Sequence, residues 1–151
     1  MQEQKVIKTL KRDLNFSENT LVKLKLFSES LIKVNQKHNF ISKNTELDLW
    51  ERHILDSAQL VKFIDFKAGS LADLGSGAGF PGLVLSIFNE NKDFHVKLYE
   101  KSPVKRAFLN NVKEKLNVKG MDIKNNVYGK EKIVADVIVC RAFKKLEEIL
   151  N

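Results

Sequence analysis

The sequence feature that most constrains the fold is a glycine-rich segment, Asp73-Leu74-Gly75-Ser76-Gly77-Ala78-Gly79-Phe80-Pro81-Gly82. It follows a short apolar run at 70–74, typical of a buried strand, and precedes a helix-like pattern at 80–88. Open parallel sheets bind their ligands at such a strand–loop–helix junction. Residues 77–82 also match the G-x-G-x-x-G pattern of dinucleotide-binding enzymes, although this match alone is weak. The loop therefore predicts an α/β fold with a ligand site at its first strand.

The remainder of the second half alternates between strand and helix patterns. Strands are predicted at 95–100, 121–127 and 135–139, and a helix at 103–116, with Ser102 as N-cap and Pro103 at its first position. This order implies right-handed crossovers and a Rossmann-like parallel sheet with helices on both faces.

The first half has a helical periodicity instead. One helix is predicted from Ser17 as N-cap, and a second follows Thr45, with Leu47 on its apolar face. We therefore expect an N-terminal helical extension (1–68) and a Rossmann-like cofactor-binding core (69–151), which together form one structural domain.

Composition excludes several classes of protein. The 151 residues are 43% hydrophobic and 30% charged, enough for a packed core. One cysteine and three scattered histidines exclude a disulfide scaffold and predict no metal site. No apolar run approaches the roughly 20 residues of a membrane span, and the N-terminus lacks a signal peptide's apolar segment. We expect a soluble, cytoplasmic, monomeric protein with no membrane partner. The net charge of +7 fits either RNA binding or a compositional bias.

Two acids decide between possible ligands. Asp73, directly before the glycines, would repel a pyrophosphate but attract the ammonium and sulfonium of S-adenosylmethionine. Glu100 ends the next strand, 27 residues later, and can accept both ribose hydroxyls of an adenosine. An NAD enzyme also has an acid there. The alternatives are therefore an NAD- or nucleotide-binding enzyme, or ordinary strand-end acids beside a ligand-free turn, but the combination favours S-adenosylmethionine.

Five segments resemble one known family. They are Asn39-Phe40-Ile41, Arg52-His53-Ile54-Leu55-Asp56-Ser57, the glycine loop, Lys105-Arg106-Ala107-Phe108-Leu109 and Arg141-Ala142-Phe143. From about residue 20 onward, the chain resembles the bacterial small-subunit (16S) rRNA methyltransferase G family, also called glucose-inhibited division protein B. The resemblance implies a class I methyltransferase that transfers a methyl group from S-adenosylmethionine to N7 of one guanine in a decoding-region loop of 16S rRNA. The family continues past Phe143, so we expect this chain to lack the C-terminal strands.

The resemblance also implies site residues. Gly75 and Phe80 contact the cofactor within a loop that includes Gly77 and Gly79. The adenine-contacting pair falls at Val127 and Tyr128, where this chain lacks the family's acid. Arg141 lies beside cofactor and substrate.

Methylation at N7 needs no general base, because that atom carries a lone pair and no proton. Catalysis can then depend on positioning. We assign no certain catalytic residue, and Arg141 is the candidate for positioning the guanine through O6. The alternative is a surface arginine paired with a carboxylate. A non-catalytic or truncated RNA-binding or assembly module with the same fold also remains open.

Three further features have two interpretations each. His53 shares a helix face with Asp56 and Ser57; it either supports the pocket or, as we favour, fixes the helix onto the sheet. Cys140 is either a thiolate nucleophile or, as favoured, a small buried hydrophobic residue. A basic group is either a phosphate-facing surface or a solvated helix face; its members are Lys101, Lys105, Arg106, Lys113 and Lys115.

Overall fold

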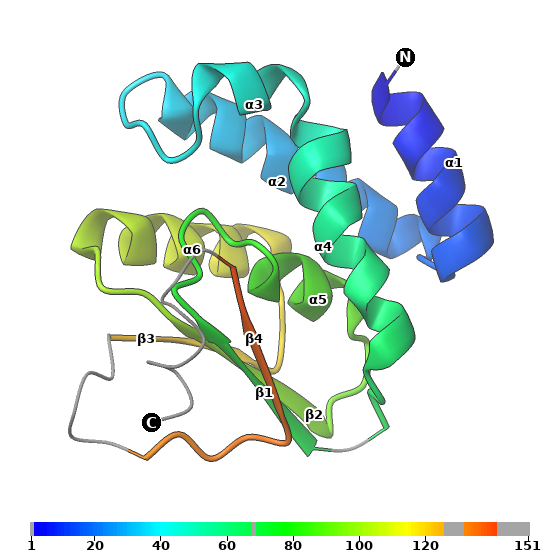
Figure 1. The fold of residues 1–151 in the computed structure, drawn as a ribbon, viewed down its shortest axis with the longest axis vertical. Coiled ribbons are helices and arrows are strands. Elements are labelled where there is room, and N and C mark those ends of the chain that lie inside the picture. The colour runs from blue at the N-terminus through cyan, green and yellow to red at the C-terminus, as the bar shows by residue number, and fades with distance from the viewer. Residues whose placement is uncertain (1, 68, 126–131, 142–151) are drawn as a thin grey trace.

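The computed structural model describes residues 2–67, 69–125 and 132–141, which contain a four-stranded parallel sheet (Figure 1). The strand order is β3-β2-β1-β4. The strands are β1 (Gly69–Leu74), β2 (Phe94–Tyr99), β3 (Met121–Lys124) and β4 (Val137–Cys140). The predicted parallel sheet is confirmed, and the last part of the predicted 121–127 strand lies outside the described residues.

Two helices connect the first three strands, α5 (Gly82–Phe88) and α6 (Pro103–Leu116). Ser102 caps α6 as predicted, with its Oγ accepting from the Lys105 amide at 3.3 Å. In the described part of the chain the helices lie on one face of the sheet (Figure 1), whereas the sequence predicted helices on both. On the other face, Ala72 and Leu74 pack against Ile133 and Ala135, which are not helical.

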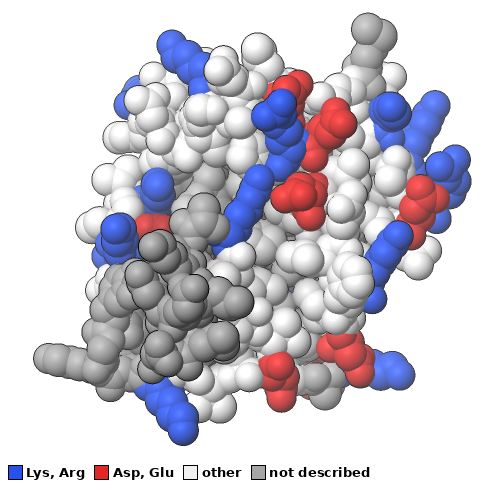
Figure 2. Space-filling model, viewed as in Figure 1, with Lys and Arg blue, Asp and Glu red and all other residues white. Residues whose placement is uncertain are grey.

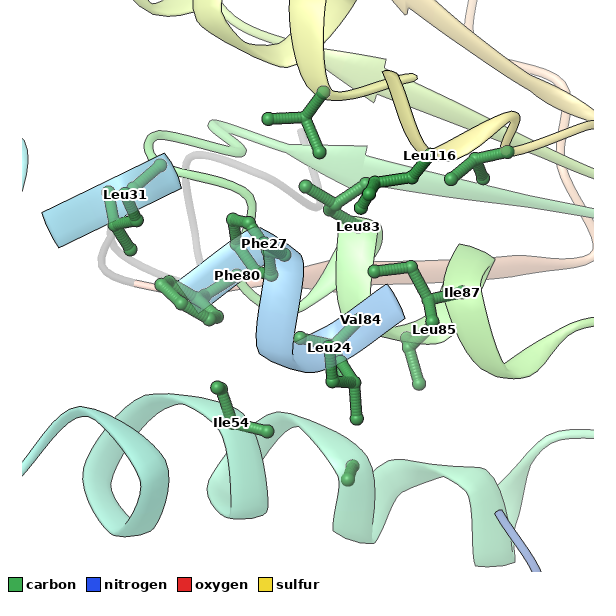
Figure 3. Close-up of a cluster of buried hydrophobic side chains, with 14 of the residues drawn as sticks. Leu24, Phe27, Leu31, Ile54, Phe80, Leu83, Val84, Leu85, Ile87 and Leu116 are labelled. Atoms are coloured by element: carbon green, nitrogen blue, oxygen red, sulfur yellow. The ribbon is translucent and has the colours of Figure 1, made fainter. Parts of the chain in front are cut away.

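The N-terminal helices pack onto the helical side of the core. They include α1 (Gln2–Leu14), which was not predicted from the sequence, and α2 (Glu18–Asn35), capped as predicted by Ser17. Figure 3 shows Phe27 of α2 beside Phe80 of the glycine loop, with Ile54 approaching from a third element. One hydrophobic cluster therefore includes residues from both predicted segments.

The helix predicted to start at Thr45 is wrong in its start and its continuity. Ser42 is the N-cap of α3 (Lys43–Leu47), and Asp48, which follows the helix, has a φ of −110° and a ψ of 27° that are not helical. The chain then forms a π-helical turn η1 (Trp50–Leu55), α4 (Asp56–Ala58) and a 3₁₀ turn η2 (Gln59–Phe63). Leu47, predicted on the apolar face, is 84% exposed because it belongs to α3, a separate short helix that buries none of its residues. π-helical turns occur often at functional sites.

No described helix combines the length and apolar character that crossing a membrane would need.

Candidate functional site

The strand register brings three of the predicted site residues to one edge of the sheet. Leu74 at the end of β1 is level with Tyr99 of β2 and with Cys140 of β4. The residues that follow these positions are Gly75, Glu100 and Arg141. All three therefore leave adjacent parallel strands at the same level, the edge at which open α/β sheets bind ligands.

The first half of the glycine loop is fastened to the end of β2. The amides of Gly75 and Ser76 both donate to the Tyr99 carbonyl, at 2.8 and 3.0 Å. The Gly77 amide donates to Glu100 Oε1 at 2.9 Å, while Glu100 Oε2 accepts from the Ser102 amide at 2.7 Å. Glu100 thus links the loop, β2 and the start of α6.

Open space lies next to this half of the loop. A Cβ added to Gly77 would meet no atom within 4 Å, and the residue has a φ of +56° that favours glycine. Glu100 as a residue is only 6% exposed, yet each carboxylate oxygen retains lone-pair capacity beyond its one amide bond. The geometry leaves room for a ligand whose hydroxyls reach that carboxylate.

Asp73 lies beneath the loop and not in this space. Its side chain is fully buried, with Oδ2 accepting from the Gly82 amide at 2.9 Å and Oδ1 buried without a hydrogen-bond partner. Burial raises the pKa of Asp73 to about 7, and the Gly82 hydrogen bond opposes that rise. Asp73 therefore fastens the start of α5, and its predicted interaction with the cofactor remains a prediction.

Phe80 is also mostly buried. Its ring lies 4.9 Å from the His53 ring in a stacked arrangement and 5.4 Å from the Phe27 ring. Gly79 approaches the neighbouring turn closely: an added Cβ would lie 2.9 Å from Leu83 Cβ. The second half of the loop is packed against the helices, so a cofactor contact by Phe80 would have to come from its backbone or ring edge.

Arg141 joins the end of β4 to η1. Its Nη1 lies 3.1 Å from His53 Nδ1, and its Nη2 donates to the Arg52 carbonyl at 3.0 Å and lies 3.6 Å from Asp56 Oδ2. A guanidinium has only donors, so His53 Nδ1 accepts and the neutral imidazole carries its proton on Nε2. Burial, and then the charge of Arg141, lower the pKa of His53.

His53 and Arg141 are 88 positions apart in the sequence, and their contact was not predicted. The only available signal was that the His53 and Arg141 motifs both belong to the same family pattern. The structure agrees with the favoured interpretation of His53 as a hydrogen-bonded anchor. It also shows the carboxylate pairing that was the alternative for Arg141.

The remaining predicted residues can also be compared with their positions in the structure. Val127 and Tyr128 lie outside the described residues. Cys140 is exposed, so the favoured buried hydrophobic role is wrong: at this register position its side chain lies on the face of the sheet away from the helices. Arg106 donates to the Glu100 and Lys101 carbonyls, both at 2.8 Å. Its guanidinium therefore stabilises the backbone before α6 and is not simply part of a phosphate-facing surface.

The described residues form neither a surface of one charge in the view shown nor a metal-binding cluster. On the face shown in Figure 2, basic and acidic side chains are interspersed and form no field of one sign. Within residues 2–67, 69–125 and 132–141, no group of three His, Cys, Asp or Glu side chains is placed to hold a metal ion.

The fold is that of class I methyltransferases. A protein-L-isoaspartate O-methyltransferase matches 91% of the chain with a TM-score of 0.55 and 16% sequence identity. A coclaurine N-methyltransferase bound to N-methylheliamine and SAH matches 98% of it, with a TM-score of 0.57 and 19% identity. This chain spans 47% and 52% of those structures.

Sequence comparison defines the family within that class. The model of the rRNA small subunit methyltransferase G family matches residues 20–151. The chain belongs to this family and is a member of the methyltransferase class of enzymes, as the resemblance implied. Ribosomal RNA small subunit methyltransferase G of Pelagibacter ubique is 38% identical over 94% of this chain, and that of Rickettsia akari is 41% identical over 91%. This chain spans 68% and 70% of those two relatives.

Proposed function

We propose that this protein methylates N7 of a guanine in the decoding-region loop of 16S rRNA, with S-adenosylmethionine as methyl donor. One observation carries the proposal: Gly75, Glu100 and Arg141 leave three adjacent parallel strands at one level, beside the open space at Gly77. Family membership supports the choice of donor and substrate. We expect the chain to act as a monomer in the cytoplasm, on the small ribosomal subunit.

The residues at this edge fit the donor. Glu100 can accept the ribose hydroxyls, and Gly77 lets the ligand approach the loop backbone closely. Asp73 acts from beneath, because a cation above the loop would favour its ionised form and so lower its raised pKa. When bound, S-adenosylmethionine supplies a sulfonium methyl group that passes to N7 while the sulfur retains the electron pair of the broken bond. The adenine contacts at Val127 and Tyr128 remain part of the proposal.

Arg141 is the residue that we assign to the guanine. Its contacts to His53, Arg52 and Asp56 fix the guanidinium at the end of β4 and leave further N–H groups that can donate to O6. The positive charge that develops on the methylated base makes this arginine a ligand of O6 or of a phosphate, and not an acid. Because N7 has no proton to lose, the site needs no base.

Methyl transfer to purified small ribosomal subunits, followed by mapping of the modified base, tests the proposal. We expect methylation at guanine N7, and a large loss of turnover in Arg141→Ala that Arg141→Lys partly restores. Methylation at another atom or another RNA would contradict the proposal, and unchanged turnover in both variants would remove Arg141 from the site.

Thermal melting with separate ligands distinguishes the alternatives, because only a ligand of the native state raises the midpoint. S-adenosylmethionine should raise it and NAD should not. Stabilisation by S-adenosylmethionine without any methyl transfer would identify a non-catalytic RNA-binding module, and stabilisation by NAD alone would identify a nucleotide-binding enzyme.

A further inference from the structure

Helices α2 and α6 pack side by side and leave a groove between them that the proposed reaction does not use. Its volume is about 650 Å³. An apolar strip runs along it, formed by Val34 from α2 and by Val104 and Phe108 from α6, and Val104 is 47% exposed. We call this feature the α2–α6 groove.

Three lysines line the groove: Lys33, Lys37 and Lys115. In the part of the chain that the structure describes, none of their ammonium groups lies within 4.0 Å of a carboxylate, whereas Lys11, Lys25 and Lys113 are paired with acids. Lys115 instead reaches across to α2 and donates to Ser30 Oγ at 3.2 Å.

The balance of charge in the groove is positive. Glu29 is the single acid among its described lining residues. Lys33 and Lys115 lie in the last turns of their helices, where each also favours the helix dipole. That effect accounts for each lysine separately, but it does not explain why cations from two helices flank one apolar strip.

The groove begins beside the candidate site. Val104 is the second residue of α6, and the residue that caps this helix, Ser102, donates its amide to Glu100. At the same end, the Lys105 ammonium lies 6.0 Å from the Phe40 ring centre. A chain lying in the groove would therefore lead toward the edge that carries Gly75 and Glu100.

We propose that the α2–α6 groove binds a single-stranded segment of the RNA substrate. Phosphates pair with Lys33, Lys37 and Lys115, and a base packs on the exposed Val104 side chain, next to the largely buried Phe108. Cations on the rim and an apolar floor match the alternation of phosphate and base along a nucleic acid strand. The inference rests on the proposed function, because it takes RNA as the substrate. It also revises the basic group predicted between residues 101 and 115, since only Lys115 of that group lines the groove.

A charge-reversal experiment with a matched control tests the groove. The variant Lys33→Glu/Lys37→Glu/Lys115→Glu is compared with Lys8→Glu/Lys92→Glu/Lys119→Glu, which changes the same net charge at exposed lysines elsewhere. The probe is a fluorescent single-stranded 16S rRNA fragment, titrated without S-adenosylmethionine at several salt concentrations. We expect the groove variant to weaken binding by about 100-fold at low salt and to lower the salt slope by about 2, at about 0.7 per phosphate contact. The control should change affinity by less than about 5-fold.

Other outcomes decide against the groove. Equal losses in the two triple variants would show a general charge effect and overturn the proposal, as would an unchanged salt slope in the groove variant. Tighter binding of polyglutamate than of the RNA fragment would assign the groove to an acidic protein segment. Val104→Ser, at an exposed position, should weaken RNA binding by about 3-fold, and no change would remove the apolar strip from the site.

Failure of the proposed function is distinguishable from failure of the groove. If the groove variant loses RNA binding but the unmodified protein transfers no methyl group, the proposal that the groove binds RNA is supported and the proposed methylation is rejected. Both triple variants should show the same rise in melting temperature with S-adenosylmethionine, which confirms that they are folded.

Discussion

The two halves of the glycine loop have different structural roles, although they look alike in the sequence. Around Gly77 the loop is fastened by Glu100 and faces open space. Around Gly82 it is crowded: an added Cβ would lie 2.2 Å from Leu98 Cδ2 and 2.5 Å from Asp73 Oδ2. The first half is therefore shaped to admit a ligand, and the second half is shaped to let α5 pack closely on the sheet.

The same difference separates the two acids. Glu100 uses both oxygens to hold backbone amides at the open side. Asp73 is buried at the crowded side with one oxygen unpartnered. The glycine loop thus has one half that can bind a ligand and one half that packs α5 against the sheet. Substitutions in the first half should affect ligand affinity, and substitutions in the second half should affect stability.

The largest expected effect is the pH dependence that Asp73 imposes on stability. Burial raises its pKa to about 7, against a reference value of 3.8, so the folded state holds a proton that the unfolded state has lost between these values. The resulting contribution to stability is present below about pH 4 and is lost as pH rises through 7. At roughly 1.4 kcal/mol per pKa unit it amounts to about 4 kcal/mol.

Urea denaturation of the wild type and of Asp73→Asn between pH 4 and pH 8 measures this contribution. The amide cannot ionise, so the variant should lack the decline in unfolding free energy across that range. Parallel pH profiles of the two proteins would show that burial does not raise the pKa of Asp73 and that this side chain is ionised throughout the range.

The next largest effect is expected at Gly82. Its replacement by alanine forces a methyl group against Leu98 and Asp73, and we expect a loss of about 3 kcal/mol from overpacking. Gly77→Ala is the matched control in the open half. It meets no atom within 4 Å, so it should cost only the strain of its positive φ, about 1 kcal/mol. Equal losses in the unfolding free energy would contradict the distinction between the two halves.

At the open side the expected effect is on affinity. Glu100→Gln leaves one acceptor oxygen where Gly77 and Ser102 both donate, and a ribose would have to compete for it. We expect about 10-fold weaker binding of S-adenosylhomocysteine by calorimetry. An analogue without ribose hydroxyls serves as the control and should lose much less affinity between wild type and variant. An equal loss for both ligands would indicate that Glu100 acts only through the loop.

Local patterns in the sequence were sufficient to predict the sheet and the helices that connect it. Strand alternation, the glycines and the Ser102-Pro103 cap are short-range signals, and each was confirmed. The start of the second predicted helix failed because Ser42 and Thr45 are both capping residues, and pattern alone did not decide between them. The conformational break at Asp48 has no comparable short-range signal in the sequence.

The site could be predicted less completely. Residue spacing placed Gly75, Glu100 and Arg141 at strand ends, and the register confirms that they share one edge. It could not show that Asp73 points beneath the loop, because alternation does not say which face a helix covers. The contact between His53 and Arg141 arises only when η1 packs beside the end of β4, so only the fold reveals it.

The smallest effect is expected from substitutions at the contact between His53 and Arg141. These substitutions test whether η1 contributes to the candidate site. In His53→Asn the side-chain oxygen can occupy the position of Nδ1 and accept from Arg141, whereas in His53→Gln it reaches the position of Nε2. Both variants lose the ring that stacks on Phe80, so they differ mainly in where the acceptor lies. If His53 positions Arg141 for the guanine, His53→Asn should have two- to five-fold higher kcat for methyl transfer than His53→Gln, with equal affinities for S-adenosylmethionine. Equal kcat values would mean that the histidine only anchors η1 to the sheet, and that Arg141 is positioned by the Arg52 carbonyl and Asp56.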